Sequence, residues 1–158
     1  MIDNLAEEKQ EMKEKNRIYQ VYGMYLAIPI GMIILLILGF MEIEIKNYGT
    51  VLLGLIIYTH VQVRKLDLVK KRKAAGPILI YVANILGLVM ALAMIPAMLN
   101  GGGEDLVLVM IGLVVLPIQI IAIVFFFLTA KDIKKAYPNM KEEAEEARKR
   151  YKEIKDRK

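Results

Sequence analysis

Charged and uncharged stretches alternate in long blocks along this chain. Four stretches carry no charged residue: 18–41, 47–63, 74–103 and 106–130. About 20 apolar residues span the roughly 30 Å hydrocarbon core of a bilayer, because each helical residue rises about 1.5 Å. A closed barrel would need short alternating strands instead, and the sequence has no such pattern. We therefore predict an all-α polytopic membrane protein, a bundle of four transmembrane helices over about 18–41, 47–63, 77–99 and 106–130.

Charged segments flank this predicted membrane domain of residues 18–130. Residues 1–17 read as a helical arm, a charged helix that runs into the first span, and residues 131–158 contain an amphipathic helix. Its apolar positions repeat at coiled-coil spacing: Met140, Ala144, Ala147, Tyr151 and Ile154. Two heptads are too few to hold a coiled coil alone. We expect this helix to lie on the membrane or on the protein's own cytoplasmic surface, or else to serve as a docking or oligomer-forming helix.

Basic residues orient the predicted spans. Six of them share the connector between the second and third spans: Arg64, Lys65, Lys70, Lys71, Arg72 and Lys73. The next connector, residues 100–105, has two acidic residues and no basic one. Short loops rich in Lys and Arg stay in the cytoplasm. We therefore predict an integral membrane protein, of the prokaryotic plasma membrane, with both termini in the cytoplasm.

The net charge of +5 indicates what this side of the protein contacts. Net positive charge also occurs in nucleic-acid-binding proteins, but membrane topology accounts for it here, and no nucleic-acid partner is expected. Basic residues near a membrane attract anionic lipids. We predict that the six basic residues of the connector contact anionic lipid on the cytoplasmic side.

Small residues recur every fourth position in two predicted spans, and such seams let helix backbones approach closely. The seams are Gly23, Ala27 and Gly31 in the first span and Ala83, Gly87 and Ala91 in the third. We expect them to be helix contact faces within one chain. Contact with a second copy, or with another membrane protein, is the alternative.

Polar side chains within the predicted spans are few, and all fall in the cytoplasmic half. They are Tyr22, Tyr25, Tyr58, His60, Tyr81, Asn84 and Gln119. One interpretation is a shallow polar pocket open to the cytoplasm. The other is that the tyrosines form an interfacial aromatic belt, while the two carboxamides hold helices together.

Residue types that carry catalysis or ion coupling are scarce. No Asp, Glu, Lys or Arg lies inside any predicted span, which argues against a proton- or sodium-coupled transporter. The chain has no cysteine, and its single histidine cannot build a multi-histidine metal site. We predict no cofactor, metal or catalytic residue, and favour a non-catalytic accessory, assembly or oligomer-forming subunit. Alternatives are a small oligomeric channel or uncoupled carrier that uses the polar pocket, and an intramembrane enzyme acting on lipid through His60.

Overall fold

The computed structural model describes residues 2–43, 46–69, 71–99 and 104–156. Within these ranges the chain is helical, without β-strands, which confirms the predicted all-α class. The elements are α1 (Ile2–Phe40), α2 (Tyr48–Val63), the short 3-10 helix η1 (Lys71–Ala74), α3 (Ala75–Leu99), α4 (Glu104–Ala136) and α5 (Met140–Asp156).

Three of these helices, α1, α3 and α4, are long and apolar enough to cross a membrane. This finding fits the first, third and fourth predicted spans by length and composition. The helix α2 is also apolar, but its 16 residues give a length of about 24 Å, less than the roughly 30 Å hydrocarbon core. A crossing by the second span, over 47–63, stays a prediction.

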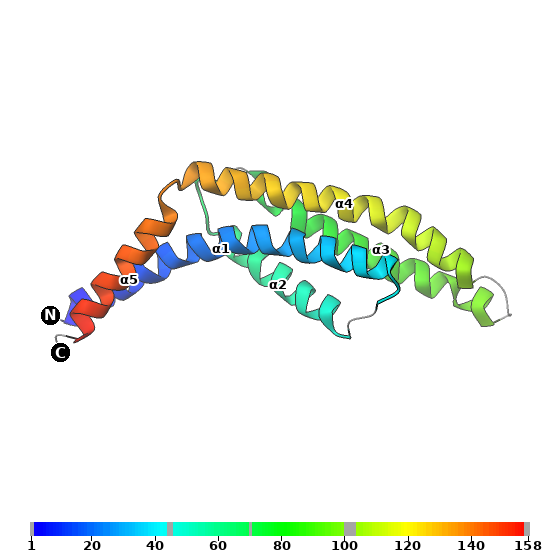
Figure 1. Ribbon diagram of the computed structural model, residues 1–158, viewed down its shortest axis with the longest axis horizontal. Coiled ribbons are helices and arrows are strands. Elements are labelled where there is room, and N and C mark those ends of the chain that lie inside the picture. Colours follow the sequence, from blue (N-terminus) through cyan, green and yellow to red (C-terminus); the bar gives the residue numbers. More distant parts are fainter. Residues whose placement is uncertain (1, 44–45, 70, 100–103, 157–158) are drawn as a thin grey trace.

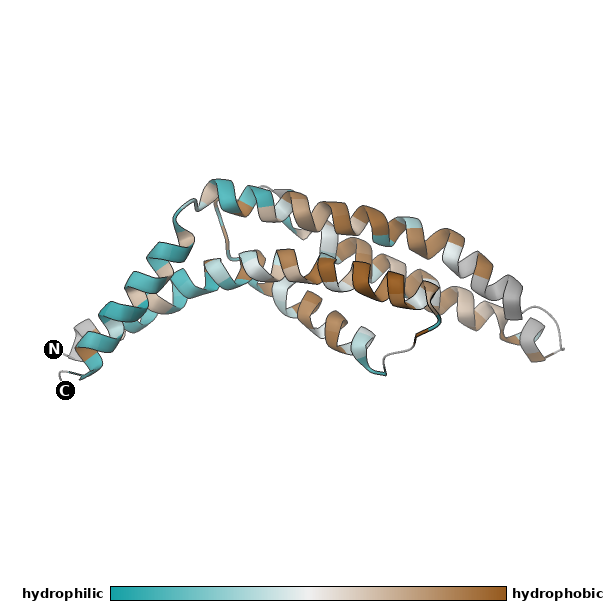
Figure 2. Cartoon of the chain, in the orientation of Figure 1, coloured by the Kyte–Doolittle hydropathy of each residue, from teal (hydrophilic) through white to brown (hydrophobic). Residues whose placement is uncertain are grey.

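The helices form an elongated bundle from which an arm projects (Figure 1). Helices α3 and α4 pack side by side over much of their length, and α1 packs on α4. The helix α2 packs mainly on α1 and has little contact with α3. The arm consists of residues 2–17 of α1 and the whole of α5, and both chain termini lie at its far end. Figure 2 shows the arm as hydrophilic and the bundle as hydrophobic.

Large apolar side chains cover much of the outer surface of the bundle. On α3 the exposed ones include Ile85, Leu88 and Leu92, which are 56–61% exposed. In water such a surface would be unfavourable, because apolar groups are driven out of contact with water. Contact with lipid removes this penalty, so the exposed apolar band fits a membrane location.

Aromatic packing forms the core where α1, α3 and α4 meet. Tyr25 of α1 and Phe126 of α4 are fully buried, with ring centroids 5.2 Å apart. Gly76, in the first turn of α3, lies against the Phe126 ring. A Cβ atom at Gly76 would approach that ring to 3.0 Å, so the close approach of α3 to α4 requires glycine here.

The apolar stripe of α5 packs on α1, and this packing of the two helices forms the arm. Met140, Ala144 and Ala147 are buried, and Tyr151 and Ile154 are partly buried. Because the partner is the N-terminal part of the same chain, the stripe is not a free docking surface. Two heptads suffice in this setting, since the loop at Tyr137-Pro138 joins α5 to a helix that is already fixed in the bundle.

Charged pairs line the edges of the arm. Lys15 pairs with Glu143, and Arg150 pairs with Glu11 at 2.7 Å. The hydrogen bond to Glu11 raises the pKa of Arg150 above its usual value. These pairs are partly exposed, and exposed pairs contribute little to stability. The buried stripe therefore supplies most of the packing between the two helices.

Candidate functional site

The connector between α2 and α3, residues 64–73, is tied to α4 by an ion pair. The Nε and Nη2 atoms of Arg72 donate to the two carboxylate oxygens of Asp132 at 2.8 and 2.9 Å. Bidentate ion pairs of this kind are among the stronger hydrogen-bonded contacts in proteins. The Asp132 side chain is only 10% exposed, so the contact is partly shielded from water.

Lys73 joins the two ends of the connector and ties it to α1. Its Nζ atom donates to the carbonyl oxygens of Arg64 and Leu66, just after the end of α2. A cation there binds carbonyl groups just beyond the helix end and complements the helix dipole. The Tyr25 hydroxyl donates to the Lys73 carbonyl oxygen at 2.6 Å, which joins the connector to the aromatic core.

The other basic residues of the connector have different surroundings. Arg64 and Lys65 follow α2 directly and are exposed. Lys71 begins η1, and Lys70 lies outside the described residues. Of the six residues predicted to contact lipid, Arg72 and Lys73 therefore form hydrogen bonds within the protein. Arg64 and Lys65 are exposed just after α2.

Polar residues of the predicted pocket lie in several separate environments. Tyr25 is buried in the core, and Tyr22 is partly buried beside it. His60 of α2 and Tyr81 of α3 lie together, with Nδ1 of the histidine 3.2 Å from the tyrosine hydroxyl. Tyr58 is 44% exposed on the outside of α2.

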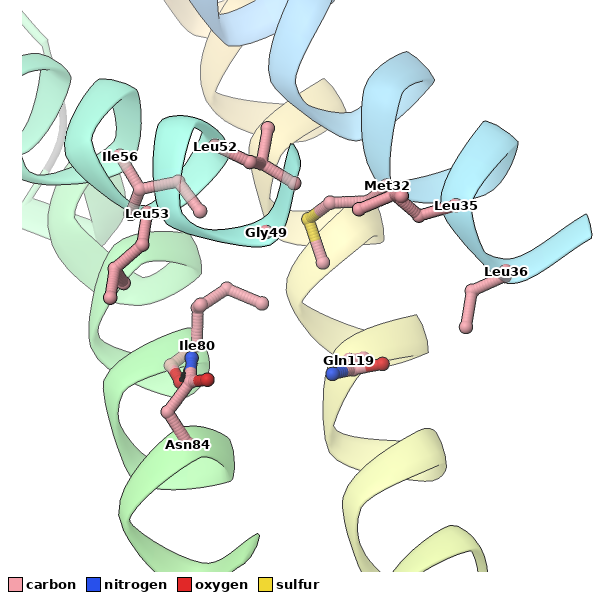
Figure 3. Close-up of a pocket in the computed structure, with 10 residues that line it drawn as sticks. All are labelled: Met32, Leu35, Leu36, Gly49, Leu52, Leu53, Ile56, Ile80, Asn84 and Gln119. Carbon is pink, nitrogen blue, oxygen red and sulfur yellow. Dashed lines mark hydrogen bonds between the residues drawn. The ribbon is translucent and has the colours of Figure 1, made fainter. Parts of the chain in front are cut away.

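Asn84 and Gln119, the remaining two, line a cavity of about 170 Å³ between α1, α2, α3 and α4 (Figure 3). Its other walls are apolar or glycine: Met32, Leu35, Leu36, Gly49, Leu52, Leu53, Ile56 and Ile80. The Asn84 amide donates to the Ile80 carbonyl oxygen of its own helix at 2.8 Å, which uses one of its donors. The seven polar residues thus do not share one cavity, but these two do.

The small-residue seam of α1 divides between two surroundings. A Cβ atom at Gly31 would lie 3.3 Å from the Tyr48 hydroxyl and 3.6 Å from Leu52, so α2 packs closely at this point. Gly23 and Ala27 are exposed instead. The steps of four residues rotate slowly around the helix, and only the last of the three positions reaches α2.

The seam of α3 is partly covered, and it faces α4 at Gly87. Ala83 is 1% exposed, and Ala91 is partly buried. A Cβ atom at Gly87 would meet Val115 of α4 at 3.6 Å, an ordinary contact distance. Gly87 of this seam therefore faces α4, with which α3 has its longest contact.

Removing the negative charge that pairs with Arg72 is expected to loosen the connector. Asp132→Asn should lower the melting temperature in detergent by a few degrees, because a charge-assisted pair contributes more than a neutral hydrogen bond. The charge-swapped variant Arg72→Asp with Asp132→Arg should recover part of the loss. Arg64→Gln, at an exposed arginine of the same connector, is the control. Equal melting of Asp132→Asn and the unmodified protein would mean that the pair contributes no stability.

Comparisons of this chain with protein-family models, with curated proteins and with solved structures found no significant match. The candidate sites are therefore defined by geometry alone. They are the connector and the arm, which lie near one end of the bundle, and the cavity at Asn84 and Gln119 within it.

Proposed function

We propose that α2 crosses the membrane together with α1, α3 and α4, and that both termini are cytoplasmic. The basic connector motivates this orientation. In support, the arm and both termini lie at one end of the molecule, and the facing ends of α3 and α4 lie at the other (Figure 1). A helix of about 24 Å can still span if the bilayer thins locally and Arg64 snorkels to the interface.

Single cysteines report this topology without background, because the chain has no cysteine of its own. In intact cells an impermeant thiol reagent should label Gly102→Cys. It should label Lys71→Cys only after the membrane is permeabilised. Labelling of Lys71→Cys but not of Gly102→Cys in intact cells would contradict the proposed orientation.

We infer that the protein is a non-catalytic accessory or assembly subunit that presents the arm to a partner. One observation carries this proposal: α1 continues without interruption from the bundle into the arm, over Ile2–Phe40. The packing of α5 braces this extension. Isolated short helices are marginal in water, so a braced pair keeps a defined shape where a single helix would fray. A shaped polar projection is suited to recognising another protein.

The contact surface for such a partner is the outer polar face of the arm. The apolar stripe of α5 is covered by α1, so it is not available without opening the arm. Exposed charged residues remain on both helices, among them Lys9, Lys13, Glu145 and Lys149. Charged surfaces give orientation and association rate more than raw affinity, which suits a subunit already held in the same membrane.

Site-specific photocrosslinking in cells tests this function. A photoreactive residue at Glu145 or Lys149 should form one discrete adduct with another protein or with a second copy. The same residue at the buried Ala144 should give only intramolecular products. If no exposed arm position forms an intermolecular adduct, the assembly function is wrong.

An uncoupled carrier would then be the competing class. It predicts solute flux into liposomes that Asn84→Leu, in the cavity wall, abolishes.

A further inference from the structure

A second cavity, of about 330 Å³, lies where the arm meets the bundle. Its walls come from α1, from the connector and from the link between α4 and α5. Ile18 and Leu66 are its buried apolar residues. Leu68, which also lines it, is 70% exposed. Charged walls next to an exposed leucine match the bilayer interface, where polar headgroups meet acyl chains.

Arg17 is a partly covered basic residue of this cavity that lacks a close carboxylate partner. It is the last charged residue before the apolar part of α1, and its side chain is 31% exposed. Its nearest carboxylate is that of Glu14, 4.0 Å from Nη2, a distance too long for a hydrogen bond. The Nε atom is covered and has no hydrogen-bond partner among the described residues. A partly covered guanidinium in this state favours an added oxyanion.

Charges of both signs surround Arg17. Lys65 and Asp67 of the connector line the cavity, and both are exposed. Lys15 also lines it, but this side chain is bound to Glu143 of α5. The cavity therefore offers Arg17 and Lys65 to an anion, and Glu14 and Asp67 to a cation. A ligand with one charge of each sign matches this lining better than a purely anionic one.

We propose that this cavity binds the headgroup of a phospholipid that carries a primary amine. Arg17 and Lys65 receive the phosphate, and Glu14 and Asp67 receive the ammonium group. The acyl chains leave past Leu68 into the bilayer. This assignment goes beyond the role of the arm in assembly, and it differs from a general attraction of anionic lipid to the connector. An anionic headgroup would meet two carboxylates here that it cannot pair.

Native mass spectrometry of the full chain, released from nanodiscs of defined lipid, tests the proposal. Phosphatidylethanolamine should be retained at least tenfold more than phosphatidylcholine, whose methylated amine keeps the charge but cannot donate hydrogen bonds. It should also be retained more than phosphatidylglycerol, which lacks the amine. Retention of all three lipids to an equal degree would overturn the proposal. Soluble glycerophosphoethanolamine should not compete at matched concentration. Competition as strong as that of the lipid would overturn the membrane source of the ligand.

Variants separate the cavity from the general charge of the surface. Arg17→Gln should abolish selective retention, whereas Arg64→Gln, which removes the same charge at an exposed position outside the cavity, should leave it unchanged. Asp67→Asn should keep phospholipid bound but lose the preference for the primary amine. Melting curves in lipid-free detergent check that each variant is folded. Equal losses in Arg17→Gln and Arg64→Gln would overturn a specific site.

Discussion

Replacing Phe126 by alanine is expected to lower the free energy of unfolding by about 2–4 kcal/mol. In soluble proteins, truncation of a buried phenylalanine costs about 3–5 kcal/mol, from lost transfer energy and from the cavity left behind. Within lipid the transfer part is small, since acyl chains are as apolar as the protein interior, and the loss of packing remains. Phe126 has no exposed surface and contacts both Tyr25 and Gly76, so the loss falls on three helices at once.

The neighbouring residue supplies the matched control. Phe127 is 38% exposed on the outside of α4, so Phe127→Ala should change the free energy of unfolding by less than about 1 kcal/mol. Both variants can be measured by reversible unfolding in mixed detergent micelles. If the two substitutions cost the same, the aromatic contact of Tyr25 with Phe126 is not the centre of the bundle.

Ala147→Glu is expected to separate α5 from α1. Ala147 has no exposed surface in the arm, and a buried unpaired carboxylate costs on the order of 3 kcal/mol. An opening free energy lowered by that amount corresponds to roughly 100-fold faster amide exchange along α5. The bundle should keep its melting temperature, because its core does not include this contact.

Two measurements check the opening of the arm. Spin labels at the exposed Lys13 and Lys149 should move apart and give a broad distance distribution in the Ala147→Glu variant. Hydrogen exchange of α5 should accelerate in the same variant. The control is Ala6→Glu, the same substitution at an exposed alanine of the arm. A narrow, unchanged distance in Ala147→Glu would show that α5 is not held by its apolar stripe.

Local composition was enough to predict much of this fold. Uncharged blocks long enough to span a bilayer became α1, α3 and α4, because helix is the structure that satisfies its own backbone groups in lipid. The sequence also predicted that the charged helix over 1–17 runs into the first span, since a change of polarity need not break a helix, and α1 is continuous over Ile2–Phe40. No proline stands between the arm and Pro29, and the helix continues through Gly23.

Tertiary contacts could not be predicted from the chain in the same way. Arg72 and Asp132 are 60 residues apart, and their pairing depends on how α4 lies against η1. One signal was present: Asp132 is the only acidic residue in the basic stretch 131–135, which faces a basic connector across the predicted cytoplasmic surface. An isolated carboxylate close to six basic residues indicates an ion pair with one of them.

The angular position of each residue around its helix explains why the polar residues do not come together. Sequence position gives the depth of a residue in the membrane, but neighbours at equal depth can face opposite sides. Tyr58 and His60 lie within one turn of α2, yet the first faces outward and the second contacts Tyr81. The weak amphipathic pattern of α2 left its orientation undetermined until it packed on α1.

Because α1 is unbroken, a tilt of its spanning part would move the arm with it as a rigid lever. The 16 described arm residues of α1 extend about 24 Å, so a tilt of about 10° in the spanning part would swing the tip by roughly 4 Å. Helices longer than the bilayer is thick respond to thinning by tilting. Pro29 lies within the bundle, beyond the arm, so any flexing there would leave the lever itself straight. Bilayer thickness would thus be converted into a displacement outside the membrane, where a bound partner could sense it.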